Sequence, residues 1–559
     1  MKSPSDTNPP RAREASGTLP VLAALSDLDP WPRFVDEAPI SFARRHRLTG
    51  VLDPHGQPTI VMASAQKDCS AAWAALDAVR RLVGEPAALA VAPDEQVLQH
   101  INRAYEARTG HADHAIQTLA ASAETDRVQD MLAGGSDDLL DGDGRAPVIK
   151  LANALLFEAV KIGASDVHVQ PLEDRVAVRM RIDGVLFEAY VLPQSVHEEL
   201  VSRIKVMGEM DIAEKRLPQD GRATVRVGDR TVDLRISSVP TSFGERVVLR
   251  LLDKSARLYS LSELGMPPET LGRFGQVIRA EHGLVLVTGP TGSGKSTTLY
   301  GSLQQINATE LNVLTLEDPI EYQLTGISQM QVSEKKGMTF ARGLRSVLRQ
   351  DPDIIMVGEI RDRETADLAI QAALTGHLVF STLHTNDAAS AVTRLLDLGV
   401  EPYLVASSLL GVMAQRLVRR VCPDCAQMLP DTPAARADLV SLQMDPNQRA
   451  ALLEGKGRVG TGCASCRNTG YRGRVGLFEL LSIDDTLREP IQQQVAAAVL
   501  KRQAMGMGMQ TLREDGIRKI LSGQTTAQEV LRVTFRGHAN AAPPEATPGE
   551  LEATVGEAV

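Results

Sequence analysis

A glycine-rich turn between an apolar strand and a helix constrains this chain more than any other feature of its sequence. The segment GLVLVTGPTGSGKSTTL contains the pattern G-x-x-x-x-G-K-S at residues 289–296. Its glycines let backbone N–H groups face a phosphate, and the helix that follows adds the positive end of its dipole. The pattern therefore predicts a phosphate-binding loop at the edge of a sheet, in preference to a glycine-rich turn without a ligand.

The side chains of this loop complete the set of groups that a nucleotide needs. Lys295 is placed to meet the β- and γ-phosphates, and the hydroxyl of Ser296 can ligate Mg²⁺. We therefore expect a nucleoside triphosphate and Mg²⁺ at this site. The predicted nucleotide-binding residues are Gly289, Pro290, Thr291, Gly292, Ser293, Gly294, Lys295, Ser296 and Thr297.

Two other apolar strands end in acidic residues, which parallel strands would bring to the same edge as the loop. NVLTLEDPIEYQL places Glu317 and Glu321 just past its strand, and DIIMVGEIRD does the same for Glu359. Gly358 stands where many nucleotide hydrolases carry an aspartate. We expect Glu359, with Ser296, to help organise hydrated Mg²⁺, and Glu321, with Glu317 as second choice, to polarise the attacking water. The alternative for each acid taken singly is a strand-end cap or a solvent-facing charge.

A histidine and two arginines lie close to these strands in the sequence. His384 follows the apolar run of TGHLVFSTLHTND and could sense the γ-phosphate or shuttle a proton, although a lone histidine is more often a packed residue. Arg342 and Arg345 share one face of the helix in TFARGLRSVLRQD. Arginines beside a phosphate site can neutralise the transferring phosphoryl group, and a solvated basic face is the usual alternative.

Four of the five cysteines form two C-x-x-C pairs, CPDC and CASC, separated by residues 426–462. Paired thiolates at this spacing predict a tetrahedral structural Zn²⁺ site rather than a redox dithiol or disulfides. Four protein ligands leave no open coordination position, so the site would serve architecture and not catalysis. The predicted zinc ligands are Cys422, Cys425, Cys463 and Cys466.

The chain is long enough for several domains, and its segments differ in pattern. No apolar run approaches the ~20 residues that a membrane span needs. Strands alternate with helices around the phosphate loop, which indicates a mostly parallel sheet, whereas short alternating strands precede it. We predict disorder at 1–18, an N-terminal module at 19–110, a linker at 111–143, an α+β domain at 144–257, a P-loop core at 258–420, a tetracysteine zinc module at 421–476, a helical region at 477–536 and a disordered tail at 537–559.

Several of these motifs together resemble the secretion and pilus ATPase family over about residues 147–535. They are the phosphate loop, TLEDPIEY, GEIRD, TGHLVFSTLHTND, AQRLVRRVCPDC and GYRGRVGLFELL. Family members carry glycine before the second acid, so Gly358 departs only from the general pattern. ASDVHVQP and AEKRLPQDGR look most like the type II secretion branch. The resemblance implies an α/β chain whose RecA-like P-loop NTPase domain follows an α+β domain, with an N-terminal docking module and a tetracysteine zinc insertion.

The resemblance also implies a motor that uses ATP, Mg²⁺ and Zn²⁺. Relatives of this kind are hexamers in which the α+β domain sits against a neighbour's RecA-like domain. Arg222, Arg235, Arg342 and Arg345 are then candidates for contacts with the γ-phosphate or across the subunit boundary, and His384 falls in the family's His box. ATP hydrolysis around the ring would drive a membrane platform that assembles a pseudopilus and exports folded proteins.

The N-terminal module, with ISFARRHRL, resembles a module that docks on the cytoplasmic domain of an inner-membrane platform protein. The implied partners are further copies of the chain, this platform domain and acidic phospholipid, but not nucleic acid. The implied location is the cytoplasm, with peripheral attachment to the inner membrane through a partner.

Two other functions compete with this one. A type IV pilus assembly ATPase is the close alternative, because paired cysteines resemble the extension branches and pilus retraction ATPases generally lack them. A RecA-like nucleic-acid translocase is disfavoured, because the net charge is −10 and aromatic residues make up 3% of the chain. Single-strand channels usually combine basic grooves with aromatic stacking.

Overall fold

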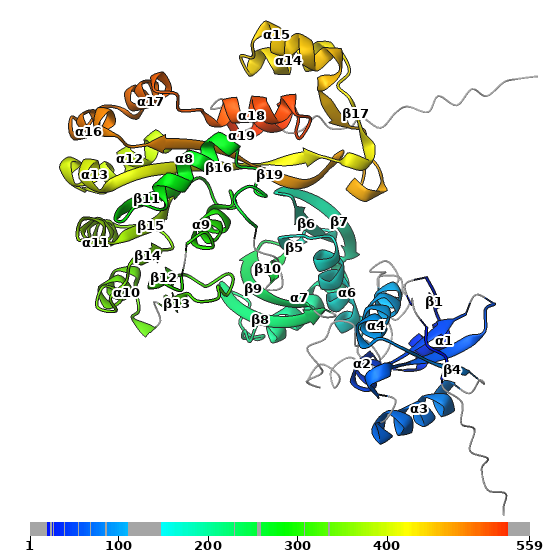
Figure 1. Cartoon of the computed structure of the whole chain (residues 1–559). Coiled ribbons are helices and arrows are strands. Elements are labelled where there is room, and N and C mark those ends of the chain that lie inside the picture. Colours follow the sequence, from blue (N-terminus) through cyan, green and yellow to red (C-terminus); the bar gives the residue numbers. More distant parts are fainter. Residues whose placement is uncertain are drawn as a thin grey trace, which may run out of the picture. The chain divides into compact units, whose positions relative to one another are not determined.

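The computed structural model describes residues 19–109, 147–253 and 259–534, with short gaps (Figure 1). The predicted disordered ends, 1–18 and 537–559, and the predicted linker, 111–143, lie outside the described residues. The chain forms two compact units, Met1–Ala256 and Arg257–Val559. The gaps are residues 23–24, 26, 39, 54, 67–68, 84–86, 228–229, 307 and 334–335.

The first part of the N-terminal unit is a small α/β module on a four-stranded sheet. The strand order is β1-β2-β3-β4, with β3 and β4 parallel and the other neighbours antiparallel. Apolar side chains such as Phe34, Val79 and Ile101 are fully buried in its core. The elements are β1 (Asp29–Pro30), α1 (Pro32–Glu37), α2 (Ile40–His46), β2 (Leu48–Leu52), β3 (Pro58–Ala63), α3 (Ser70–Val83), β4 (Ala88–Ala92) and α4 (Asp94–Thr109).

The second part of this unit is the predicted α+β domain. Its six-stranded sheet has the order β7-β6-β5-β10-β9-β8, and all neighbouring strands are antiparallel. Buried residues alternate with less buried ones along β9, as the alternating sequence predicts. The elements are α6 (Pro147–Lys161), β5 (Asp166–Pro171), β6 (Arg175–Ile182), β7 (Val185–Pro193), α7 (His197–Met207), β8 (Gln219–Val227), β9 (Arg230–Thr241) and β10 (Gly244–Asp253).

The C-terminal unit is built on a seven-stranded sheet of order β13-β12-β14-β15-β11-β16-β19. Only the edge strand β19 is antiparallel to its neighbour. The four predicted strands appear as β11 (Gly283–Thr288), β12 (Val313–Glu317), β14 (Ile354–Val357) and β15 (Leu378–Leu383). The other elements of this core are α8 (Pro268–Val277), α9 (Lys295–Leu303), β13 (Ser328–Gln331), α10 (Phe340–Val347), α11 (Arg363–Leu374), α12 (Ala388–Asp397), α13 (Pro402–Ser408) and β16 (Leu409–Val421).

The four central strands β12, β14, β15 and β11 are buried along their whole length. Two apolar clusters, one containing Leu286 and Ile355 and the other Val285 and Phe380, form the core around them. Neighbouring residues such as Val285 and Leu286 fall in different clusters because side chains alternate between the faces of a strand. Because these four strands are parallel, their carboxyl ends meet at one edge of a sheet that is buried on both faces.

The structure corrects one predicted boundary in the C-terminal unit. The predicted zinc module (421–476) and helical region (477–536) meet inside β19 (Tyr471–Ser482), which pairs with β16 and belongs to the main sheet. The reason is that GRVGLFELL is a buried strand of the ATPase core rather than the start of a helical region. The remaining elements are β17 (Ala426–Met428), α14 (Pro433–Ser441), α15 (Pro446–Ala451), β18 (Arg458–Gly460), α16 (Asp485–Gln492), α17 (Ala497–Gly506), α18 (Leu512–Leu521) and α19 (Ala527–Thr534).

The helices are short throughout the described part of the chain, the longest being α4 with 16 residues. Among the described residues, none of them combines the length and the apolar character that a bilayer crossing requires.

Candidate active site at the carboxyl edge of the sheet

The phosphate loop leads from β11 into α9 and packs against β16. Gly289 and Gly294 have φ angles of 153° and 88°, a region that favours glycine. A Cβ on Gly289 would lie 2.4 Å from the carbonyl oxygen of Gln415, and one on Gly294 would lie 2.9 Å from Gln415 Nε2. Thr298, in the first turns of α9, donates to Gln415 Oε1 at 2.6 Å. The glycines are therefore required by the turn and by its close approach to β16.

Lys295, the first residue of α9, is folded back over this loop and is 9% exposed. Its Nζ donates to the carbonyl oxygens of Gly289 at 2.9 Å and Pro290 at 3.0 Å. Burial, opposed by the Glu359 carboxylate and assisted by Arg416, lowers the pKa of the ammonium to about 8. An incoming phosphate would add negative charge beside Nζ, which favours the charged form.

Glu359 and His384 come together from the ends of neighbouring strands β14 and β15. His384 Nε2 lies 3.4 Å from Glu359 Oε2, and Arg361 Nη2 donates to Glu359 Oε1 at 2.5 Å. Partial burial lowers the pKa of His384 below 6.5, and the charge of Lys295 lowers it further, against the effect of Glu359. The sheet edge thus carries a carboxylate and a largely neutral imidazole within electrostatic reach of Lys295.

Gly358 has a packing role in the sheet. Its N–H donates to the carbonyl oxygen of Leu316 on β12 at 2.8 Å. A Cβ at Gly358 would lie 3.1 Å from that same oxygen and 3.5 Å from the ring of Phe340. A side chain there would press closely on the backbone of β12 and contact the ring of Phe340 on α10, and the acid follows one residue later, at Glu359.

The two candidate bases differ in their surroundings. Glu317 is 4% exposed, and its Oε1 accepts hydrogen bonds from Thr315 Oγ1 at 2.5 Å and from Gln329 Nε2 at 2.9 Å. The hydroxyl of Tyr300 donates to Glu317 Oε2. Burial and this carboxylate raise the pKa of Tyr300. With both oxygens engaged, Glu317 has a clear structural role in joining α9 to β12.

Glu321 is half-buried, and its backbone N–H donates to the Tyr300 hydroxyl at 3.2 Å. The segment after β12 is therefore fastened to the helix that begins with Lys295. Since Glu317 is engaged inside the core, the geometry favours Glu321 over Glu317 as the carboxylate that polarises water, which stays a prediction.

The candidate arginines lie in two places. Arg342 and Arg345 are exposed on α10, where Arg345 Nη2 donates to Glu364 Oε1 at 2.6 Å and Arg342 Nη1 donates to the Gly337 carbonyl at 3.1 Å. Arg222 and Arg235 belong to the N-terminal unit, where they lie directly opposite each other on β8 and β9. Two like charges side by side on a sheet repel each other, which suits an anionic partner.

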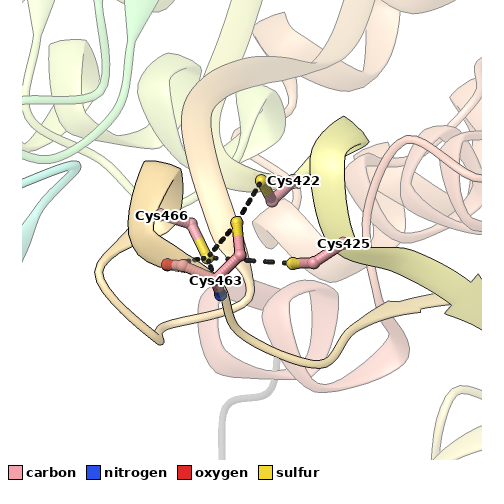
Figure 2. Close-up of side chains that lie close together, drawn as sticks. All are labelled: Cys422, Cys425, Cys463 and Cys466. Atoms are coloured by element: carbon pink, nitrogen blue, oxygen red, sulfur yellow. Dashed lines mark hydrogen bonds between the residues drawn. The ribbon is translucent and has the colours of Figure 1, made fainter.

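The four cysteines of the two C-x-x-C pairs come together beyond the end of the β16–β19 ribbon (Figure 2). All four Sγ atoms lie within 4.8 Å of one another. The Sγ distances are 3.9 Å for Cys422–Cys463, 3.8 Å for Cys425–Cys466 and 3.7 Å for Cys463–Cys466. Tetrahedral ligands at the Zn–S bond length of 2.3 Å would be about 3.8 Å apart, so the cluster has the dimensions of a zinc site.

The backbone around the cluster also suits thiolates. Cys466 Sγ accepts hydrogen bonds from the N–H groups of Cys463 at 3.2 Å and Gly470 at 3.3 Å. Hydrogen bonds to a charged sulfur favour the deprotonated form that binds metal. The cluster is compatible with Zn²⁺ held by four protein ligands, with no coordination position left for a substrate.

Sequence reasoning missed some residues that support this site. Gln415 supports the phosphate loop from β16, and Thr288, the last residue of β11, accepts from the Thr385 N–H at 3.0 Å. Gln415 is 1% exposed in a strand that is otherwise largely apolar. A buried amide within such a strand was the available signal, because it must find polar partners.

A mostly parallel sheet, a G-x-x-x-x-G-K-S loop between β11 and α9, and acids at the neighbouring strand ends define a P-loop NTPase. Comparison with known proteins gives the family. Residues 141–532 match the model of the family described as type II/IV secretion system protein, and residues 18–111 match the MshEN domain model. The chain belongs to the type II/IV secretion system protein family and is an ATP hydrolase.

Individual relatives agree with this assignment. The chain is 50% identical over 449 residues to the type II secretion system protein HxcR of Pseudomonas aeruginosa, covering 80% of this chain and 90% of the relative. It is 45% identical over 497 residues to the type II secretion system ATPase E of Vibrio cholerae, covering 89% and 96%. The X-ray structure of the ATPase DotB of Legionella pneumophila matches with a TM-score of 0.50 at 22% identity, over 70% of this chain and 97% of that one. The latter likeness concerns the fold.

Proposed function

We propose that this chain is the ATPase motor of a type II secretion system, in which ATP hydrolysis drives assembly of a pseudopilus that exports folded proteins. The observation that carries the proposal is the 45–50% identity to type II secretion proteins over most of both chains. The names of these relatives favour type II secretion over type IV pilus assembly. The intact phosphate loop, Glu359 and Glu321 favour a hydrolysing motor over a scaffold that only binds nucleotide.

The residues at the sheet edge divide the catalytic work. Lys295 and the loop N–H groups hold the phosphates, and the exposed hydroxyl of Ser296 would ligate Mg²⁺. Glu359 would orient the water shell of the ion from β14, and Glu321 would polarise the attacking water. His384, which contacts Glu359, would hold that carboxylate in place and sense the γ-phosphate.

Assembly into a ring would complete the site. Arg222 and Arg235, paired on the sheet of the N-terminal unit, would contact the γ-phosphate bound by another copy of the chain. Arg342 and Arg345 on α10 would serve the subunit boundary. An absent arginine finger can cost factors of about 10³ or more in rate, so the unassembled chain would hydrolyse ATP slowly. A hexamer is the assembly we propose.

The remaining parts would connect the motor to its surroundings. The tetracysteine cluster would hold one structural Zn²⁺. Residues 19–110 would dock on the cytoplasmic domain of an inner-membrane platform protein, which would keep the chain cytoplasmic and peripheral to the inner membrane. Acidic phospholipid would strengthen this attachment.

Mg-ATP turnover by the purified chain tests the proposal. The rate is compared for the chain alone, with single-stranded DNA, and with a platform protein's cytoplasmic domain plus acidic phospholipid. We expect strong stimulation by the platform and lipid mixture and none by DNA. Stimulation by DNA alone would overturn the secretion motor and favour a nucleic-acid translocase.

A further inference from the structure

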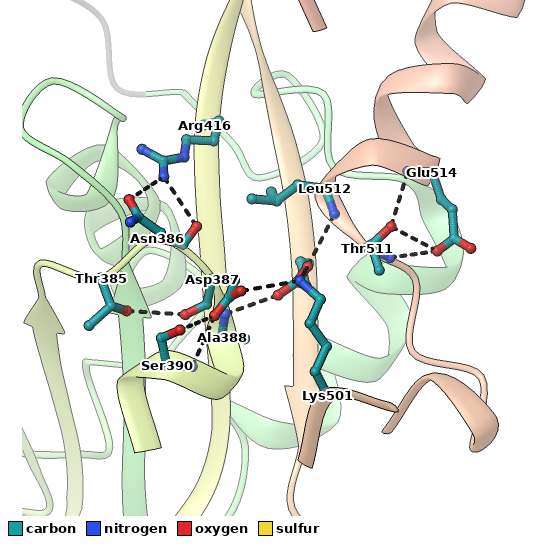
Figure 3. Close-up of polar contacts among 11 residues, drawn as sticks. Thr385, Asn386, Asp387, Ala388, Ser390, Arg416, Lys501, Thr511, Leu512 and Glu514 are labelled. Carbon is teal, nitrogen blue, oxygen red and sulfur yellow. Dashed lines mark hydrogen bonds and ion pairs between the residues drawn. The ribbon is translucent and has the colours of Figure 1, made fainter. Parts of the chain in front are cut away.

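The segment after β15 is tied to the base of the phosphate loop through Thr288. It is also tied to Arg416 through Asn386, and Figure 3 shows this second contact. Thr385 Oγ1 lies 2.7 Å from Thr288 Oγ1, and the Thr385 N–H donates to the same Thr288 oxygen at 3.0 Å. Arg416 Nη2 donates to Asn386 Oδ1 at 2.9 Å and to the Asn386 carbonyl at 3.2 Å. The position of His384, which immediately precedes these residues, is thus fixed on its C-terminal side.

The same segment is tied at its other end to the C-terminal helices. Asp387 caps α12, with Oδ1 accepting from the Ser390 N–H at 3.0 Å. Its second oxygen, Oδ2, lies 3.3 Å from Nζ of Lys501 on α17. Lys501 Nζ also lies 3.1 Å from Oε2 of Glu479 on β19. One ammonium group therefore bridges two carboxylates that come from different parts of the fold.

Glu479 is the most buried member of this network, with 0% exposure. Its Oε1 accepts from the N–H of Ala388 at 2.9 Å, and its Oε2 accepts from the N–H of Leu512 at 3.3 Å. These two donors belong to the first turns of α12 and α18, whose positive dipole ends favour a carboxylate. Two carboxylates, one ammonium and two helix N-termini thus form one connected polar network.

We propose that Lys501 is a positioning residue for ATP hydrolysis. By holding Asp387 and Glu479 together, it sets the place of residues 384–388, and with them His384 opposite Glu359. Displacement of α17 or α18 would then reach the catalytic carboxylate through Lys501, Asp387 and His384. The proposal goes beyond the motor function and rests on the proposed role of Glu359.

The test compares, in the full-length chain, two lysines of the same C-terminal region that each pair with a buried carboxylate, Glu479 or Asp515. Lys501→Met breaks the network described above. The control, Lys519→Met, removes a contact outside that network, the one of 2.5 Å between Lys519 Nζ and Asp515 Oδ2. In that pair Asp515 Oδ2 accepts from the N–H of Phe478 on β19. Steady-state ATP hydrolysis, binding stoichiometry and affinity for a fluorescent ADP analogue, and amide exchange of residues 384–390 are measured for each variant.

We expect kcat to fall about 10- to 100-fold in Lys501→Met, because small misplacements of a catalytic group have effects of that size. ADP affinity and stoichiometry should stay within about twofold, and amide exchange of 384–390 should accelerate. Lys519→Met should keep its kcat per nucleotide-binding site. Unchanged kcat in Lys501→Met, or equal losses in both variants, would overturn the proposal.

Two further variants keep the outcome interpretable. If Lys501→Met does not fold, Asp387→Asn replaces it and is judged by the same outcomes, since asparagine can still cap α12 while the charge paired with Lys501 is gone. Glu359→Gln tests the catalytic assignment itself. Wild-type hydrolysis by Glu359→Gln would remove the basis of the proposal. If Glu359→Gln loses hydrolysis while Lys501→Met keeps full activity, only the role of Lys501 is refuted.

Discussion

The phosphate site and the tetracysteine cluster lie in the same unit but are built in opposite ways. The phosphate site collects Lys295, Glu359 and His384 from the segments that follow three separate strands, β11, β14 and β15, and it depends on the order of strands in the sheet. The cysteine cluster uses four cysteines from two short 3₁₀ turns, with all sulfurs within 4.8 Å. Cys422 follows Gln415 by seven residues, about 23 Å along an extended strand.

This difference shows which kind of site a local sequence pattern can define. Four thiolates that fill a tetrahedron leave no position for a substrate, so the cluster can only stabilise its surroundings. The phosphate site keeps exposed groups, such as Ser296, beside buried ones, such as Lys295. Because β16 separates the phosphate site from the cysteine cluster, a variant that inactivates one of them should leave the other intact. Four predictions test this.

The largest expected effect is the loss of hydrolysis in Lys295→Ala. The variant removes the ammonium that meets the β- and γ-phosphates, so we expect no measurable Mg-ATP turnover with an unchanged zinc content. Colorimetric phosphate release and metal analysis check this. The control is Lys336→Ala, an exposed lysine of the same unit. Turnover within about tenfold of wild type in Lys295→Ala would refute the assignment.

A second pair of variants separates the two candidate bases within the phosphate site. Glu321→Gln should lower kcat by about 10²- to 10⁴-fold, as loss of a general base does. Glu317→Gln should instead destabilise the unit by about 1–3 kcal/mol, because an amide cannot accept from all three buried donors. Hydrolysis rates and urea unfolding midpoints distinguish them. The reverse pattern would make Glu317 the base.

Cys463→Ser should act only on the other region. Loss of one ligand should release the metal and loosen residues 421–470, because metal binding contributes folding free energy. Nucleotide affinity should stay near the wild-type value. Amide exchange and equilibrium binding of an ADP analogue provide the measurements. A chelator should loosen the same residues in the wild type and have no further effect on Cys463→Ser. Loss of nucleotide binding by Cys463→Ser would show that the two regions are coupled.

The smallest expected effect is a change of kcat/KM with pH, at most about tenfold per pH unit. The pKa of Lys295 is lowered to about 8, and only its ammonium form attracts phosphate, so kcat/KM should fall as pH rises above about 8. The value of kcat should respond less, because bound triphosphate raises that pKa. Zinc content should stay constant, since thiolates remain deprotonated. A flat kcat/KM up to about pH 10 would contradict the assignment.

The sequence predicts well what is encoded locally. The phosphate loop, the four core strands and the cysteine quartet each follow from one short pattern, and the structure contains the loop, the strands and the clustered sulfurs. The sequence ranked Glu321 above Glu317 as the base but could not show how Glu317 is engaged, because Tyr300 reaches Glu317 from α9 through packing of the helix on the sheet. The antiparallel place of β19 beside β16 was missed for a similar reason.

Contacts between distant segments were the least predictable. Lys501 pairs with Asp387, 114 positions away, and with Glu479 in a third segment. The sequence around Lys501, AAAVLKRQAMG, reads as an ordinary amphipathic helix with a solvent-facing lysine. Only the packing of α17 near α12 and β19 turns that lysine inward, and no local pattern signals it.

The most direct test of the central claim measures hydrolysis, ADP-analogue binding and zinc content side by side in the wild type, Glu359→Gln and Cys463→Ser. We predict that Glu359→Gln loses turnover but keeps nucleotide binding and about one zinc per chain. Cys463→Ser should lose its zinc and keep nucleotide binding. Wild-type turnover in Glu359→Gln, or loss of nucleotide binding together with zinc in Cys463→Ser, would contradict the separation of a catalytic sheet edge from an architectural metal cluster.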